Sequence, residues 1–253
     1  VKKRAAEFDL IACSGGDGTL DEVVTGMMKC EEKRPIGYIP AGSTNDFANS
    51  LQIPKRMTEA AKCIVENCAY LCDVGSFNGD YFVYIAAFGI FTDVSYQTNQ
   101  DMKNILGHLA YVLEGAKRIF NVKSYEVELE VQGEHIKDEF IYGMVTNSES
   151  VGGFHSITGK NIQLDDGLFE VTMIRTPHNA IELQEIISSL LRGEMDSKYI
   201  FSYKTDHVIL RAEEKIPWTL DGEYGGDHKE VEIFCHQKAV SILVNHLPGE
   251  SEL

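Results

Sequence analysis

The sequence predicts an α/β domain followed by a β-rich domain. In the first 72 residues, apolar runs typical of buried strands alternate with helical patterns. Residues 73–246 are instead dominated by short strand-like runs, and residues 247–253 are expected to form a C-terminal tail. The length supports this division, because 253 residues suffice for two modest domains that each bury a core.

The first domain is expected to contain a parallel sheet. Residues 8–13 and 36–40 are apolar runs that predict strands, whereas residues 21–33 and 57–67 predict helices. Residues 44–51 begin with N-cap chemistry and predict a short helix. Strands that alternate with helices form parallel sheets with right-handed crossovers. The chain opens almost directly on its first strand, so we expect an N-terminal segment of the protein to precede this sequence.

The second domain is expected to be mostly antiparallel. Two of its stretches, residues 102–120 and 179–191, have helical spacing and are interpreted as core-facing helices. The other runs predict strands over residues 81–85, 124–131, 136–147, 168–174, 207–211 and 231–234.

Composition limits the partners of this protein. The formal net charge of -16 argues against a nucleic-acid partner, because binding to phosphate backbones depends on clustered Lys and Arg. No run approaches the roughly 18 apolar residues of a membrane span. Six cysteines without a second metal-ligand pair are interpreted as reduced, buried side chains. The sequence therefore predicts a soluble, cytoplasmic protein whose membrane contact is peripheral and transient.

A glycine-rich loop lies between the first predicted strand and helix. In the segment SGGDGT, Gly15, Gly16 and Gly18 allow the backbone to approach a ligand without a Cβ atom in the way. Free amides at a helix N-terminus make a site suited to phosphate. Asp17 is positioned to orient nucleotide hydroxyls and Thr19 to donate to a phosphate oxygen. The alternative is a tight strand-to-helix turn without a ligand.

A second loop of small and hydroxyl residues favours the ligand site. The segment PAGSTNDFA, residues 40–48, also follows a strand and precedes a helix. Both loops are expected at the carboxyl edge of neighbouring parallel strands, where α/β proteins bind ligands. Two phosphate-binding loops on one edge arise by chance far less often than one.

The two loops together resemble the catalytic domain of the diacylglycerol kinase family in its bacterial soluble form. The resemblance rests on GGDGTLDEVVTG and PAGSTNDFANSL and extends through AAFGIFTDVSYQTN, LGHLAYVLEGAKRI, LDDGLFEV and LDGE, nearly the whole chain. It implies a Rossmann-like nucleotide domain, a β-sandwich-like domain and an ATP cleft between them. The family's usual first strand and an Asn-Pro element that touches ATP have no counterpart here, which supports a missing N-terminal segment.

The resemblance also implies which residues bind the nucleotide. Ser43 stands where the family usually has a nucleotide-contacting Thr, and the hydroxyl group is kept. The residues expected to line ATP are Gly15, Gly16, Asp17, Gly18, Thr19, Leu20, Asp21, Ser43, Thr44 and Asn45.

Two late carboxylates are the candidate catalytic groups. In the segment WTLDGE, Asp221 and Glu223 are two residues apart and are expected on one side of an extended segment. Phosphoryl transfer to an alcohol needs a group that accepts the hydroxyl proton and a metal that offsets charge, so either carboxylate could serve as the base while the other positions metal or water. A polar turn is the alternative, since Asp-Gly is a common turn pair. By resemblance this segment is catalytic, with Glu223 preferred as the base and Asp221 as its partner.

A metal site is implied by the segment QLDDGL. In the family, a structural Mg²⁺ is held by the Asp before the Gly and by carbonyl groups on either side. The corresponding ligands here are Gln163, Asp166 and Leu168, and such oxygen ligands suit hard cations. A solvated Asp-Gly turn is the alternative.

The sequence thus predicts an ATP- and Mg²⁺-dependent lipid kinase. Its acceptor is expected to be diacylglycerol or a related lipid alcohol, and an exposed strand edge makes a homodimer conceivable. Two alternatives are an NAD kinase-like enzyme, which shares the first glycine loop, and a non-catalytic nucleotide- or lipid-binding protein. The retained carboxylates Asp17, Asp221 and Glu223 argue against the second alternative.

Overall fold

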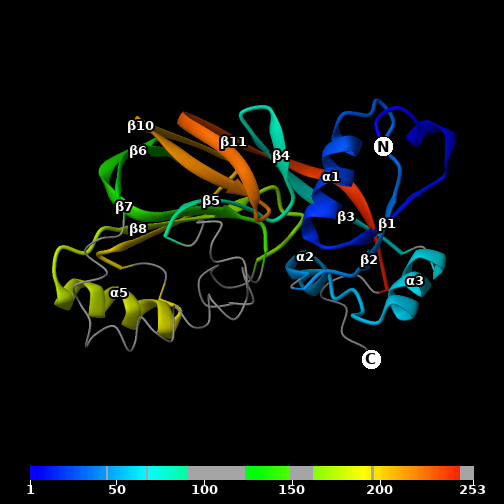
Figure 1. The fold of residues 1–253 in the computed structure, drawn as a ribbon, viewed down its shortest axis with the longest axis horizontal. Helices are drawn as coiled ribbons and strands as arrows, with labels where there is room; N and C mark the ends of the chain where they lie inside the picture. Colours follow the sequence, from blue (N-terminus) through cyan, green and yellow to red (C-terminus); the bar gives the residue numbers. More distant parts are fainter. Residues whose placement is uncertain (44, 67, 91–122, 149–161, 195–196, 246–253) are drawn as a thin grey trace.

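The computed structural model describes residues 1–43, 45–66, 68–90, 123–148, 162–194 and 197–245. The helix predicted over residues 102–120 lies outside them. The described chain has two parts, a helix-covered N-terminal part and a β-rich part that extends away from it (Figure 1). The prediction of an α/β part followed by a β-rich part is confirmed.

The N-terminal part is built on two short parallel strands. Its elements are η1 (Ala5–Glu7), β1 (Ile11–Gly15), α1 (Asp17–Met28), β2 (Ile36–Pro40), α2 (Asp46–Ser50) and α3 (Met57–Glu66). β1 and β2 are paired in parallel, with Ile11 opposite Ile36. α1 was predicted to start at Asp21, but it starts four residues earlier. The carbonyl of Gly16 accepts from the amides of Thr19 and Leu20, so the glycine loop itself is the first helical turn.

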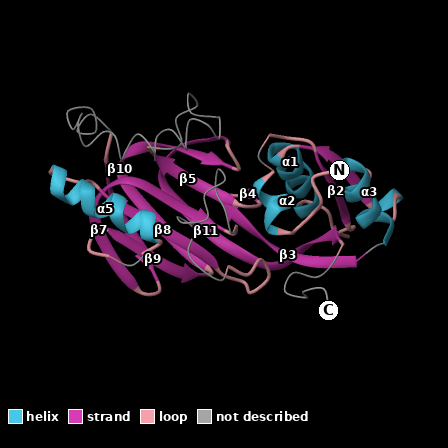
Figure 2. Cartoon of the chain, turned by 90° about the horizontal axis from the view of Figure 1, so that it is seen from below, coloured by secondary structure: helices cyan, strands magenta, loops and turns pink. Residues whose placement is uncertain are grey.

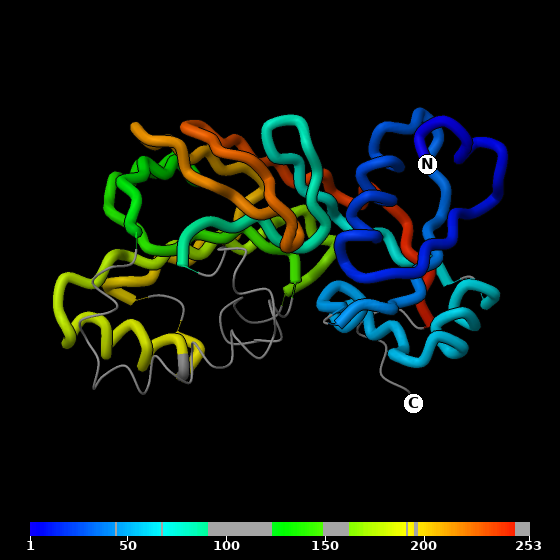
Figure 3. Tube along the Cα trace, in the orientation of Figure 1, coloured from blue at the N-terminus to red at the C-terminus, as the bar shows by residue number. Residues whose placement is uncertain are grey.

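The end of the chain supplies a third parallel strand. β11 (Glu223–Val244) pairs in parallel with β2, with Ile242 opposite Ile36, and antiparallel with β3 (Cys68–Phe77). Figure 3 shows this last strand running from the β-rich part back to the N-terminal part. Sequence analysis grouped these residues with the second domain. A contact between residues more than 200 positions apart is not visible in local patterns.

The β-rich part is antiparallel throughout its described strand pairs. Its other strands are β4 (Asp80–Phe82), β5 (Ile85–Gly89), β6 (Tyr125–Val131), β7 (Glu134–Thr146), β8 (Phe169–Arg175), β9 (Ile200–Thr205) and β10 (His207–Leu220). They join the N-terminal strands in one sheet with the order β1-β2-β11-β10-β5-β7-β8-β9, where β3 also pairs with β11 and β6 with β10 and β7. Strands β3 and β9 were not predicted, and the predicted strand 81–85 is two strands separated by a bend.

One helix covers the far end of this part. α5 (Ala180–Arg192) lies near β7, β8 and β9, at the opposite end from α1, α2 and α3 (Figure 2). Its first turn is capped by Asn179, whose side-chain oxygen accepts from the amides of Ile181 and Glu182 at 3.0 Å. It ends at Gly193, whose φ of +64° suits a glycine cap. Helix 179–191 was therefore predicted nearly to its ends.

The core of the β-rich part is aromatic. Trp218 on β10 is buried, and its ring centroid lies 5.1 Å from that of Phe77 and 4.8 Å from that of Phe88. Edge-to-face and tilted ring pairs of this kind add to the stabilisation from burial. This cluster holds β3, β5 and β10 together.

We expect Ile242→Ala to destabilise the whole protein, because it removes a buried side chain where β11 meets β2. Truncations of this kind cost about 2–5 kcal/mol. Ile181→Ala on α5, where the side chain is 70% exposed, is the matched control and should change the unfolding free energy by less than about 0.5 kcal/mol. Urea unfolding of both variants measures the difference. Equal midpoints would contradict the joining role of β11.

Candidate functional site

The two glycine-containing loops lie against each other. A Cβ atom built on Gly42 would be 2.5 Å from the Cα atom of Gly16, closer than any real side chain allows. The carbonyl of Gly15 accepts from the amide of Ala41 at 2.7 Å and from the hydroxyl of Tyr38 at 3.2 Å. The loops that follow β1 and β2 therefore form one backbone-lined surface at the carboxyl edge of the parallel strands.

Asp17 and Asn45 fix the second loop. The carboxylate of Asp17 accepts from the amides of Asp46 and Phe47 at 3.2 and 3.4 Å, at the start of α2. Asn45 has a φ of +52°, a conformation that Asn tolerates better than most residues. Its side chain accepts from the amide of Gly42 at 2.9 Å and donates to the carbonyl of Gly42 at 2.8 Å. Both side chains thus shape the loop from within.

The other predicted nucleotide residues differ in exposure. Thr19 and Ser43 are exposed, so their hydroxyl groups are open to a ligand. The side chain of Leu20 is fully buried in the core, so only its backbone is left for the predicted contact with ATP. Thr44 lies outside the described residues.

Asp221 and Gly222 form a tight hairpin turn. Both have positive φ, +51° and +88°, and they connect β10 to β11 where Leu220 pairs with Glu223. Two positive φ angles in a two-residue loop are typical of the turns that fit the twist of a hairpin. The expectation of an extended segment was therefore wrong, because Asp-Gly turns the chain. As a result Asp221 is buried and Glu223 is exposed.

Glu223 lies over the glycine loop. Its Oε1 atom is 3.5 Å from the position that a Cβ atom on Gly18 would occupy. Gly18 belongs to the N-terminal part, whereas Glu223 opens the last strand of the β-rich part. The fold thus brings together two predicted site residues that are 205 positions apart. An acidic side chain beside a phosphate-type loop is suited to accept a proton from a group that attacks the phosphate.

Asp221 is anchored by backbone amides. Its carboxylate accepts from the amides of Val83, Tyr84 and Ile85 at 2.6, 3.0 and 2.9 Å. These amides point toward the carboxylate at the bend that separates β4 from β5. Burial raises the pKa of Asp221 to about 6, and the three hydrogen bonds oppose that rise because they stabilise the charged form. Both carboxylate oxygens are therefore engaged in holding the turn.

Asp21 on α1 faces the same carboxylate. Burial is the main cause that raises the pKa of Asp21, and together with the neighbouring Asp221 carboxylate it brings this pKa to about 8. Sequence analysis named Asp21 as a nucleotide residue, but it did not place it beside Asp221, because the two lie on elements that meet only in the folded chain.

The predicted metal ligands lie in a turn that is bound by the side chain of Asp73. The carboxylate of Asp73 accepts from the amides of Gly167 and Lys238, each at 2.6 Å. Asp166 accepts from the amide of Leu168 at 3.0 Å and forms an ion pair with Lys204 at 2.8 Å. Sequence analysis missed Asp73, although a lone carboxylate in the otherwise uncharged run AYLCDVGSF was a signal of a buried, hydrogen-bonded role.

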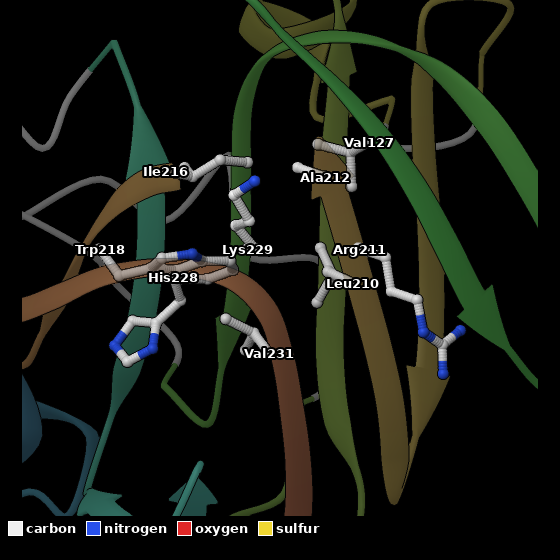
Figure 4. Close-up of a pocket in the computed structure, with 9 residues that line it drawn as sticks. All are labelled: Val127, Leu210, Arg211, Ala212, Ile216, Trp218, His228, Lys229 and Val231. Atoms are coloured by element: carbon white, nitrogen blue, oxygen red, sulfur yellow. The ribbon is translucent and has the colours of Figure 1, made fainter. Parts of the chain in front are cut away.

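Within the described ranges, no group of three or more His, Cys, Asp or Glu side chains is arranged to hold a metal ion. The predicted Mg²⁺ ligands are of a different kind, because they combine one carboxylate with two backbone carbonyls. A small hollow elsewhere, between β6, β10 and β11, contains none of the predicted site residues (Figure 4). It is lined by Val127, Leu210, Arg211, Ala212, Ile216, Trp218, His228, Lys229 and Val231.

Two family models match the chain in succession. Residues 1–77 match the diacylglycerol kinase catalytic domain, and residues 85–244 match the YegS C-terminal NAD kinase beta sandwich-like domain. A diacylglycerol kinase of Bacillus subtilis strain 168 is 38% identical over 222 residues, which are 87% of this chain and 73% of the relative. The chain belongs to the diacylglycerol kinase family.

Other members of this family agree with the assignment. A diacylglycerol kinase of Staphylococcus carnosus is 33% identical over 228 residues, 88% of this chain and 74% of the relative. A candidate diacylglycerol kinase of Bacillus anthracis Sterne, solved as a crystal structure, superposes with a TM-score of 0.78 at 27% identity over 96% of this chain and 81% of that one. The predictions of the family, of an ATP-dependent lipid kinase and of ATP use are confirmed.

Among the described helices, none is long and apolar enough to cross a membrane.

We expect Gly42→Ala to weaken ATP binding about tenfold or more, because the new Cβ atom forces the two loops apart. Gly18→Ala is the matched comparison. Its Cβ atom meets Glu223 at an ordinary 3.5 Å, and Ala is favoured in the first turn of α1, so the loss should be smaller. Calorimetric titration with ATP measures both. Undiminished affinity in Gly42→Ala would show that the contact between the loops is unimportant for binding.

Proposed function

We propose that this kinase transfers the γ-phosphoryl group of ATP to the hydroxyl group of diacylglycerol, with Glu223 as the general base. The observation that carries the proposal is the position of the Glu223 carboxylate over Gly18 in the glycine loop. The names of the relatives favour diacylglycerol as the acceptor. Related lipid alcohols present the same hydroxyl beside apolar chains, which apolar pockets distinguish weakly.

The chemistry follows from this arrangement. The acceptor hydroxyl gives its proton to the Glu223 carboxylate as its oxygen attacks the γ-phosphorus atom. A new oxygen–phosphorus bond forms, the bond to the β-phosphate oxygen breaks, and ADP leaves with that electron pair. Positioning and neutralisation of charge supply most of the catalysis in phosphoryl transfer. Asp221 is the partner of Glu223 in this proposal, because its amide-bound carboxylate fixes the turn from which Glu223 projects.

We place ATP between the two parts of the chain. Residues 1–72 then form a Rossmann-like nucleotide domain, and residues 73–246 form the substrate domain up to the tail, residues 247–253. The phosphates would lie on the amides of the glycine loop, with Asp21 near its end. The contact between Gly18 and Glu223, which come from different parts, supports a site at this junction. Ser43, Thr44 and Asn45 would complete it from the second loop.

We propose that Mg²⁺ is required, and that Gln163, Asp166 and Leu168 hold a structural ion. One carboxylate and two carbonyls are suitable hard ligands, and the turn that carries them is braced by Asp73. In this structure the Asp166 carboxylate pairs with the ammonium of Lys204. A bound cation would take the place of that ammonium, so the two positive groups compete for one carboxylate.

The remaining proposals concern the cell compartment, the membrane and the oligomeric state. All six cysteines are unpaired thiols, which suits a reducing cytoplasm.

We propose transient peripheral contact with the membrane that holds the lipid acceptor. Tyr224, the residue after Glu223, is 64% exposed and offers an aromatic ring for this contact. Among the described strands, β1, β4 and β9 each pair with one neighbour only; of these, the edges of β4 and β9 in the β-rich part are the candidate surfaces for a homodimer.

We expect Glu223→Gln to lower kcat by at least about 100-fold while ATP binding stays nearly unchanged, because the amide keeps the size of the side chain but accepts no proton. Glu230→Gln is the control, since Glu230 is an exposed carboxylate on the same strand. Single-turnover kinetics and ATP titration separate the two effects. Turnover at the wild-type rate in Glu223→Gln would remove this residue from the role of base.

We expect phosphate transfer from radiolabelled ATP to diacylglycerol in mixed micelles, dependent on Mg²⁺. Phosphatidylglycerol, a sphingoid base, an isoprenoid alcohol and NAD serve as competing acceptors, and a longer protein with the preceding segment restored should be assayed beside this chain. Transfer to another lipid would change the acceptor alone. Transfer to NAD alone would contradict the lipid assignment, and ATP binding without any transfer would favour a non-catalytic protein.

A further inference from the structure

A buried hydroxyl group lies at the contact between the two glycine-containing loops. It belongs to Tyr38 on β2, whose side chain is 1% exposed. The hydroxyl donates to the carbonyl of Gly15 at 3.2 Å and lies 3.5 Å from the side-chain oxygen of Asn45. Gly15 belongs to the first loop, residues 14–19, and Asn45 to the second loop, residues 40–48. One hydroxyl group therefore contacts both loops.

The position of this hydroxyl group is set by the core. β2 is the middle one of the three parallel strands, with β1 on one side and β11 on the other. The ring of Tyr38 belongs to the same buried core as Leu20 of α1 and Phe47 of α2. A tyrosine side chain has only two χ angles, and close packing of its ring leaves the hydroxyl group little freedom. The loops are thus attached to a fixed point.

The hydroxyl group contributes to its partners and not to the packing of the ring. A phenylalanine ring would fill the same space without any polar atom to satisfy. A buried hydroxyl group, in contrast, costs free energy unless it is hydrogen-bonded. The effect of the hydroxyl group of Tyr38 therefore lies in the two loop groups that it contacts.

In the first loop, the hydroxyl group fixes the direction of a peptide bond. The carbonyl of Gly15 accepts from the Tyr38 hydroxyl and also from the amide of Ala41, at 2.7 Å. The N–H of Gly16 points opposite to this carbonyl, because the peptide bond is planar and trans. Glycines on both sides leave this peptide bond freer to rotate than any other pair would. Two donors on one carbonyl thus orient the amide of Gly16, which is the N-cap of α1.

In the second loop, the hydroxyl group lies beside the oxygen that shapes the turn. The side-chain oxygen of Asn45 accepts from the amide of Gly42 at 2.9 Å. Gly42 in turn packs against Gly16 of the first loop. The Tyr38 hydroxyl therefore touches the fixed end of each loop, on either side of the place where the two backbones meet.

We propose that Tyr38 is a positioning residue for the phosphates of ATP, because its hydroxyl group holds the peptide between Gly15 and Gly16 and the side chain of Asn45 in place. The inference rests on the proposed placement of the phosphates on the two loops. Without the hydroxyl group, the Gly15 carbonyl keeps only the amide of Ala41 as a partner, and the peptide can rotate. The backbone amides then no longer present one arrangement to the phosphates.

The test compares Tyr38→Phe with Tyr142→Phe by calorimetric titration with ATP and with adenosine, which has no phosphate groups. Tyr142 is the matched control, because it is a buried tyrosine on β7 whose hydroxyl donates to the sulfur atom of Met144 at 3.4 Å. Each variant loses one buried hydroxyl group and keeps the ring. The thermal unfolding midpoint without ligands should fall by only a few degrees in either variant.

We expect Tyr38→Phe to weaken ATP binding about tenfold, as the loss of one hydrogen bond can, and to leave the affinity for adenosine unchanged. Tyr142→Phe should change neither affinity. A purely structural role of Tyr38 would weaken the binding of both ligands alike. Undiminished ATP affinity in Tyr38→Phe, or an equal loss for ATP and adenosine, would overturn the proposal.

Gly42→Ala, titrated in the same series, separates this inference from the placement of the phosphates. If Gly42→Ala weakens ATP binding and Tyr38→Phe does not, the phosphates lie on the loops but the hydroxyl group does not position them. If neither variant weakens ATP binding, the placement of the phosphates is contradicted together with the role of Tyr38.

Discussion

The hydrogen-bond register of β11 is the constraint on which the site depends. This strand begins at Glu223, which lies over Gly18, and near its end Ile242 pairs with Ile36 between the two parallel strands. The distance between the candidate base and the glycine loop is therefore set by ladder hydrogen bonds, not by a flexible linker. A shift by one residue would turn every side chain of the strand to the other face and move Glu223 off the loop.

Carboxylates that accept from backbone amides hold the other pieces in place. Asp17 joins the glycine loop to the start of α2, Asp221 joins the hairpin turn to the start of β5, and Asp73 joins the turn at Gly167 to the bulge at Lys238. Each accepts two or three N–H groups. Fixed peptide dipoles can stabilise a negative charge without a cationic partner.

The candidate site contains several carboxylates close to one another. Acidic side chains approach a surface that is expected to receive the phosphates of ATP, where like charges repel. Backbone amides offset the charge of Asp17 and Asp221. Glu223 is exposed, so its carboxylate stays open to solvent and to an incoming hydroxyl. The fold thus separates carboxylates that brace the backbone from the one that can exchange a proton.

The sequence by itself determined the family, the glycine loop between β1 and α1, and the division into an α/β part and a β-rich part, because these depend on local residue patterns and on a resemblance that spans the chain. Only the tertiary structure decided that Asp-Gly is a hairpin turn that buries Asp221, that Glu223 lies over Gly18, and that β11 pairs with β2. These outcomes join residues up to 206 positions apart, such as Ile36 and Ile242. Such contacts are fixed by the packing of the whole chain and leave no periodic signal in the segments that make them.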